Sequence, residues 1–305
     1  MAEMLRLWAF CILFTLTTAA TLNKAPVFNK VNEEPMVRNA FPSTFTVMPR
    51  IANGNRAEVG VFPWHAFLII KYRTNKPEDP PTFCSGAILN EEWIISTAEC
   101  LSNAVTVRVD VGSVNINTPS RSVYPYSSTL HPDYNNTNGL FKNNIALLRL
   151  SGENMLNFDG VNGEYAPVRL PNKRQINETF VGYESYFTGF GYPSQNSKNI
   201  SEYLLFAEQM IIRNIECQGF YGNNLELISD NVICSLSVNL RQGICFRDNG
   251  GPLVVNEYGT NTLVAVLSFV HKTGNCGKEA SPAVYTRITK YFEWISNITK
   301  YQIRP

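Results

Sequence analysis

Four separate segments constrain the fold of this chain more than any other feature of its sequence. Each joins a short apolar run to a cysteine or to a group of polar residues. In chain order they read CSGAIL at 84–89, WIISTAEC at 93–100, NIALLRL at 144–150 and CFRDNGGPL at 245–253. Short apolar runs bounded by turn residues are typical of β-strands. The segments therefore favour a fold built mainly from strands.

The same pattern recurs along the chain. Apolar or alternating runs lie at 82–89, 93–98, 105–111, 145–150, 204–212, 231–234, 253–256 and 263–269. Many short runs and few helical ones predict an all-β barrel or sandwich. The clearest helix lies at the C-terminus, where apolar residues recur at helical spacing and predict a packing face. These residues are Ile288, Tyr291, Phe292, Ile295 and Ile298.

In their order and surroundings, the four segments resemble the chymotrypsin-like serine proteases, which read TAHC, DIALL and GDSGGP at the corresponding places. The resemblance covers residues 51–305. It implies an all-β, chymotrypsin-like double six-stranded antiparallel β-barrel with a C-terminal helix and a cleft between the barrels. Periodicity alone gives only the all-β class.

The three reactive positions of that family hold different residues here: Glu99 for histidine, Asn144 for aspartate and Asn249 for serine. The family's reaction needs a hydroxyl nucleophile, an imidazole base and an acid that orients the base. A carboxamide is not a useful nucleophile, and a glutamate with its ordinary pKa of about 4.3 is a weak base at neutral pH. We therefore predict that the chain is not an enzyme but a non-catalytic serine protease homologue. A weakly active serine-type endopeptidase and a secreted carrier or structural glycoprotein are the alternatives.

The backbone beside the nucleophile position also departs from the family. The oxyanion region corresponds to Arg247 and Asn249, and the family has glycine where Arg247 stands. A side chain there makes a glycine-type backbone conformation less accessible. Its guanidinium is also placed to pair with Glu99.

The resemblance implies a specificity pocket as well. The base of this pocket corresponds to Gly243, so no acid is present to select lysine or arginine, and Val270 is expected to narrow the entrance. The pocket positions are Gly243, Ser268, Phe269, Val270 and Ala283.

We expect no metal ion and no cofactor. The calcium loop of trypsin-like relatives carries paired carboxylates, and Asp110 is the only acid between residues 108 and 126. Zinc is disfavoured because the chain has no CxxC motif and its histidines are isolated. Among these, His65 and His131 are predicted to be surface or structural residues, and His271 to lie near the rim of the cleft.

The N-terminal part of the chain predicts export and processing. Residues 1–20 read as a secretory signal peptide whose apolar run is too short to span a bilayer. Residues 21–50 lack periodicity and are predicted to be a flexible pro-segment. The resemblance makes Arg50–Ile51 an activation junction, where cleavage would free an amine to pair with Asp248.

Seven cysteines are present, and Cys11 lies in the signal peptide. The six others, an even number in an exported chain, predict a disulfide framework, although their number leaves the pairing open. The family resemblance implies one pairing, which is Cys84–Cys100, Cys217–Cys234 and Cys245–Cys276.

The remaining surface features fit an exported glycoprotein. The net charge of +1 and the lack of a basic block argue against a nucleic-acid partner. Loops at 71–81 and 224–230 are predicted to be solvated surface loops, with binding of a partner as the alternative. Sequons predict N-glycosylation at Asn135, Asn177, Asn199 and Asn297.

Together these features predict a secreted, extracellular protein without a membrane span that acts by binding other proteins. The expected partners are proteases, their substrates or their inhibitors. The expected role is that of a cofactor, decoy or regulator in an extracellular proteolytic cascade of the immune or clotting type.

Overall fold

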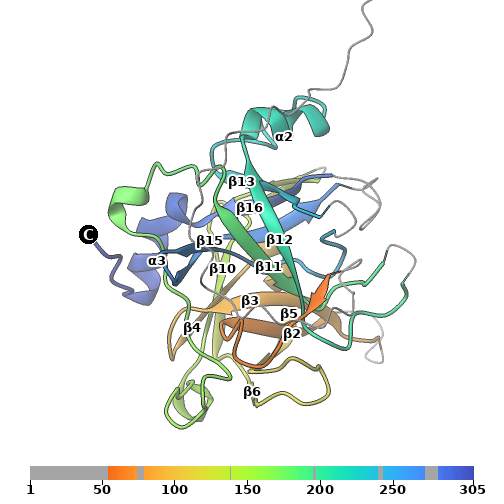
Figure 1. The fold of residues 1–305 in the computed structure, drawn as a ribbon. Coiled ribbons are helices and arrows are strands. Elements are labelled where there is room, and N and C mark those ends of the chain that lie inside the picture. The colour runs from red at the N-terminus through yellow and green to blue at the C-terminus, as the bar shows by residue number, and fades with distance from the viewer. Residues whose placement is uncertain (1–53, 74–78, 138, 195–196, 240–242, 272–280) are drawn as a thin grey trace, which may run out of the picture. The chain divides into compact units, whose positions relative to one another are not determined.

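The computed structural model describes residues 54–73, 79–137, 139–194, 197–239, 243–271 and 281–305. The predicted signal peptide, pro-segment and Arg50–Ile51 junction lie outside the described residues, as do part of the 71–81 loop and Cys276. Within the described ranges, strands predominate and helices are few and short (Figure 1). The all-β prediction is confirmed.

The first sheet contains seven described strands, all antiparallel, with β2 paired to both β3 and β5. In sheet order they are β6 (Arg121–Val123), β5 (Ala104–Val111), β2 (His65–Tyr72), β3 (Thr82–Ile88), β4 (Trp93–Ser96), β10 (Ala146–Arg149) and β7 (Ser127–Leu130). A short hairpin of β8 (Asn135–Thr137) and β9 (Leu140–Lys142) precedes β10.

The second sheet closes on itself. In order its described strands are β1 (Asn55–Arg56), β12 (Leu205–Ile212), β11 (Glu184–Gly189), β14 (Pro252–Glu257), β15 (Thr260–Val270), β16 (Ala283–Arg287) and β13 (Val232–Ser237). Because β12 also pairs with β13, six of them form a closed barrel, and the two-residue β1 is added to β12. The closed second barrel thus has the six strands that the resemblance implies, and the first sheet has seven described strands.

Three apolar clusters explain why the strands pack in this way. Successive side chains of a strand point to opposite faces, and both faces of β2 are buried. Leu68 and Ile70 pack inside the first sheet. Phe67 points the other way and belongs to a cluster that includes Phe190 and Val254 from the second half of the chain. This shared cluster joins the two sheets, and a separate cluster fills the second barrel.

The helices are α1 (Ala98–Leu101), α2 (Asn214–Phe220) and α3 (Phe292–Thr299), together with the 3-10 turns η1 (Gly152–Asn154), η2 (Lys173–Gln175) and η3 (Ile288–Tyr291). The predicted C-terminal helix is confirmed, because η3 and α3 bury Ile288, Phe292 and Ile295 in the cluster between the sheets. In the described part of the chain, every helix is too short or too polar to cross a lipid bilayer.

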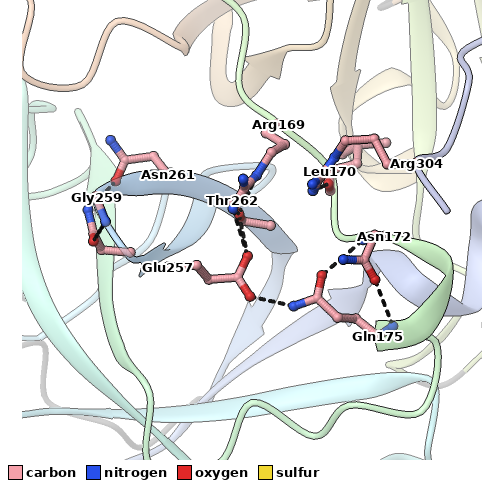
Figure 2. Close-up of polar contacts among 10 residues, drawn as sticks. Arg169, Leu170, Asn172, Gln175, Glu257, Gly259, Asn261, Thr262 and Arg304 are labelled. Atoms are coloured by element: carbon pink, nitrogen blue, oxygen red, sulfur yellow. Dashed lines mark hydrogen bonds and ion pairs between the residues drawn. The ribbon is translucent and has the colours of Figure 1, made fainter.

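A polar network fastens the connection between the sheets to the β14–β15 hairpin. Arg169 donates to Glu257 at 2.9 Å and to Thr262 at 2.7 Å, and Thr262 donates to the same carboxylate at 2.7 Å. Gln175, which caps η2 together with Asn172, donates to the other oxygen of Glu257. Figure 2 shows these groups converging on Glu257. The network therefore fixes the path by which the chain passes from one sheet to the other.

Two disulfides join pairs of described cysteines. Cys84–Cys100 ties β3 to α1, and Cys217–Cys234 ties α2 to β13. Cys245 also takes part in a disulfide. The loop at 224–230 is less solvated than predicted, because Ile228 is only 1% exposed and packs beside the Cys217–Cys234 bridge.

Candidate functional site

Three residues that are far apart in the sequence meet beside α1. The Asn249 side-chain amide donates to Glu99 Oε2 at 2.9 Å. The Glu99 backbone N–H donates to Asn144 Oδ1 at 2.8 Å. We call Glu99, Asn144 and Asn249 the Glu99 cluster. The structure thus brings together the three positions that the sequence singles out.

Asn144 is held from the second sheet. Its side chain is buried and donates to Ser268 Oγ on β15 at 2.8 Å, while its carbonyl accepts from Thr286 Oγ1 on β16 at 2.7 Å. The preceding residue, Asn143, has a left-handed φ of 51° and accepts a hydrogen bond from the Tyr291 hydroxyl at 3.0 Å. Contacts with β15, β16 and η3 therefore fix the position of Asn143 and Asn144.

The turn that carries Asn249 is fixed by its backbone. The Asn249 carbonyl accepts from Ser85 N–H at 2.8 Å, and Gly250 N–H donates to the Leu267 carbonyl at 2.8 Å. Gly250 has a φ of +81°, and a Cβ at this position would lie 2.1 Å from the Ser85 carbonyl oxygen. Only glycine satisfies both conditions. The position of Asn249 is therefore set by backbone packing between β3 and β15.

Arg247 differs from two sequence-based expectations. Its φ of 75° is left-handed, so it takes up a glycine-type conformation in spite of its side chain, at a cost of about 1 kcal/mol. Among the described ion pairs, none joins Arg247 to Glu99. The Glu99 carboxylate accepts from the Asn249 amide instead, and Arg247 remains exposed.

Burial dominates the electrostatics of the cluster. Burial raises the pKa of Glu99, and hydrogen bonds from Asn249 and Asn144 hold it down by a smaller amount. The Glu99 charge contributes to raising the pKa of two phenols, Tyr72 and Tyr134, although burial is the larger cause for both. Sequence analysis misses these tyrosines, because they come from separate segments and no motif marks them.

Asp248, the predicted latch partner, is fully buried beside the cluster. Its carboxylate accepts backbone N–H groups from Gly191 at 2.7 Å and Cys245 at 3.1 Å. Burial raises the pKa of Asp248 to about 7, against the smaller effect of these two donors. Its predicted counterpart, Ile51, lies outside the described residues.

The predicted pocket positions fall on two neighbouring strands and one turn. Val270 on β15 is directly opposite Ala283 on β16, and Ser268 Oγ accepts a hydrogen bond from the Asn144 side-chain amide. Phe269 and Gly243 are half-buried. The assignment of these residues to a specificity pocket stays a prediction.

The histidines lie away from the cluster's hydrogen bonds. His65 is buried between the sheets, where Nδ1 lies 2.9 Å from Thr188 Oγ1 and the ring packs on Phe190. His131 packs against Tyr291, and His271 against Tyr221. Among the described residues, no group of three or more His, Cys, Asp or Glu side chains is arranged to hold a metal ion.

The two antiparallel sheets, joined by one shared core, define the fold class of chymotrypsin-like serine proteases. A solved structure of HL collagenase matches with a TM-score of 0.70 and 26% identity, over 82% of this chain and 99% of that one. The family model described as Trypsin matches residues 51–295, so this chain belongs to the trypsin family. The fold predicted from the resemblance is therefore confirmed.

Relatives with known names match over most of this chain. It is 28% identical over 252 residues to venom serine protease Bi-VSP of Bombus ignitus, covering 80% of this chain and 67% of that protein. It is 30% identical over 259 residues to vitamin K-dependent protein C of Rattus norvegicus, covering 81% of this chain and 51% of that protein. The chain thus spans about half the length of the protein C relative.

These comparisons contradict the prediction that the chain is not an enzyme. The relatives that match it include proteins named as a serine protease, a venom protease and a collagenase. The prediction was wrong because it rested on only three residues, Glu99, Asn144 and Asn249. The likeness to the protease family extends over residues 51–295. The cluster itself presents one carboxylate and two carboxamides, and the Ser268 hydroxyl accepts a hydrogen bond from Asn144.

Proposed function

We propose that this chain is a secreted member of the trypsin family that acts by binding protein through the surface around the Glu99 cluster. The role would be that of a cofactor, decoy or regulator in an extracellular proteolytic cascade of the immune or clotting type. The partners would be proteases, their substrates or their inhibitors. A signal peptide at 1–20 and glycans at the predicted sequons belong to the same proposal.

One observation carries the proposal. The side chains at the centre of the site are joined to one another, since Asn249 donates to Glu99 and Glu99 donates to Asn144. The scaffold around them is retained, including the Gly250 turn and the shared core. Such an arrangement supplies a preorganised set of hydrogen-bonding groups, which suits recognition of a partner. The asparagines of all four sequons are exposed, which supports glycosylation.

Affinity capture tests this proposal. The secreted chain is immobilised, exposed to its source fluid, and the retained proteins are identified by mass spectrometry. We expect proteases or their inhibitors, and we expect Asn249→Ala to lose them. The matched control is Asn157→Ala, which removes an exposed asparagine from another segment. Equal capture by both variants would show that the cluster is not the binding surface.

A second candidate function is a weakly active serine-type endopeptidase. The names of the relatives favour it, since they are proteases. A covalent serine-hydrolase probe and a panel of peptide substrates test it. Turnover that Asn249→Ala abolishes and Asn157→Ala preserves would establish this function, and lack of turnover by the purified chain would exclude it.

Cleavage after Arg50 is proposed to act as a switch. The freed Ile51 amine would pair with Asp248, whose buried carboxylate receives only backbone N–H donors among the described contacts. A buried carboxylate gains from a cation only if the geometry is good. We expect cleaved protein to melt at a higher temperature than uncleaved protein. Equal melting temperatures would refute the switch.

A further inference from the structure

The Glu99 carboxylate is partly buried and has no cationic partner within the described ranges. None of the four ion pairs among the described residues includes it. Its described side-chain hydrogen bond comes from the neutral amide of Asn249 at 2.9 Å. Burial raises its pKa more than the two asparagines lower it. The hydrogen bonds of the two asparagines therefore offset only part of the cost of burying the Glu99 charge.

The surroundings of Glu99 suit a positive group. The phenols of Tyr72 and Tyr134 both lie within the electrostatic field of the carboxylate. The Tyr72 hydroxyl donates to the Cys100 carbonyl at 2.8 Å, so its proton is already used and does not neutralise Glu99. A carboxylate whose neighbours are neutral phenols and amides is available to a charged hydrogen-bond donor.

The charged residue near the cluster, Arg247, is not paired with the Glu99 carboxylate among the described ion pairs. Arg247 is exposed, and its charge acts on Tyr72, but it forms no ion pair with Glu99. Glu99 itself is half-buried, so one part of its side chain remains accessible to solvent. An incoming cation can therefore reach the carboxylate without first breaking an ion pair between described residues.

We propose that the Glu99 cluster binds a cationic side chain, the guanidinium of an arginine or the ammonium of a lysine, on an extracellular partner protein. This inference rests on the proposed function and names the chemical group that the partner presents. It assigns Glu99 the charged contact. Asn249 has the role of a positioning residue, because its amide fixes the orientation of the carboxylate.

Peptide probes that differ only in charge test the inference. Calorimetric titration of the mature chain uses acetylated, amidated pentapeptides, Gly-Ala-Xaa-Ala-Gly, in which Xaa is arginine, lysine or citrulline. Citrulline keeps the shape of arginine and lacks its charge. We expect the arginine and lysine peptides to bind about tenfold more tightly than the citrulline peptide, since a hydrogen bond to a charged group is the stronger one.

Glu99→Gln is the decisive variant. Its side-chain carbonyl can still accept from Asn249, so the geometry is kept while the charge is removed. We expect this variant to bind all three peptides equally. The matched control is Glu293→Gln, which removes an exposed carboxylate from α3 and should keep the preference. Equal melting temperatures of the two variants verify folding.

Three results would overturn the inference: equal affinity for arginine and citrulline, a preference that survives in Glu99→Gln, or no binding of the arginine peptide at millimolar concentration. None of these decides the proposed function, which the capture experiment tests separately. Loss of captured partners in Asn249→Ala together with no preference for cationic peptides would keep the proposed function and reject this inference.

Discussion

Replacing His65 by glutamine should change how the stability of the protein depends on pH. The ring is buried between the sheets, Nδ1 lies 2.9 Å from Thr188 Oγ1, and Nε2 has no hydrogen-bond partner among the described residues. Protonation would place a charge in an apolar site and add an N–H group without an acceptor. Burial accordingly lowers the pKa of His65 from 6.5 to about 3.

The sign and size of the effect follow from this shift. Below pH 6.5 His65 is protonated in the unfolded chain but stays neutral in the folded chain. The free energy of unfolding therefore decreases as the pH falls from 6.5 toward 3. At pH 4.5 the penalty is about 3 kcal/mol, from about 1.4 kcal/mol for each pH unit below 6.5. Asp248 acts in the opposite direction, because its raised pKa of about 7 makes the folded chain retain a proton. The dependence of wild-type stability on pH therefore contains opposite contributions from His65 and Asp248.

The comparison of His65→Gln with wild type isolates the histidine. Both proteins are unfolded in urea, with disulfides intact, at pH 7.5, 6.0 and 4.5. Glutamine can keep a hydrogen bond to Thr188 and does not titrate, so the variant should gain about 3 kcal/mol relative to wild type on going to pH 4.5. His131→Gln is the matched control and should show a smaller change of the same sign, since burial also lowers the pKa of His131. Parallel stability curves for His65→Gln and wild type would refute the reasoning.

Other substitutions test the packing that positions the site. Glu257→Ala should cost about 2 kcal/mol in urea unfolding, because Arg169 is left part-buried without its carboxylate, and a cost below about 0.5 kcal/mol would show that the network is not needed. Gly250→Ala should prevent recovery of folded protein, because the new Cβ meets the Ser85 carbonyl at 2.1 Å, and normal yield and melting temperature would contradict this.

Apolar runs bounded by turn residues predicted several strands from the sequence, including β4 and β15, which are buried on both faces. The run at 105–111 corresponds to β5 (Ala104–Val111), and the run at 263–269 lies within β15 (Thr260–Val270). β2 (His65–Tyr72) was missed, and its apolar residues do not alternate with polar ones, since Phe67 and Leu68 pack into different clusters. Burial on both faces removes the alternating signal, so strands such as β2 and β15 can be predicted only from a short apolar run bounded by turn residues.

Part of the candidate site could be predicted from the sequence and part could not. Glu99, Asn144 and Asn249 were found because their flanking motifs are local in sequence, and the structure joins them. The contacts of Ser268 with Asn144 and of the Tyr72 phenol with the Cys100 carbonyl were not predicted. These contacts depend on how segments far apart pack together, and no local pattern records them.

The most direct test of protein binding at the Glu99 cluster is photo-crosslinking from position 247, whose side chain is exposed beside Asn249. A photoreactive phenylalanine derivative replaces Arg247, the purified chain is illuminated in an extract of its source, and the adducts are sequenced by mass spectrometry. We predict a small set of adducts with intact proteases or protease inhibitors. Adducts that include neither proteases nor protease inhibitors, or no adducts at all, would contradict binding of such partners at this surface.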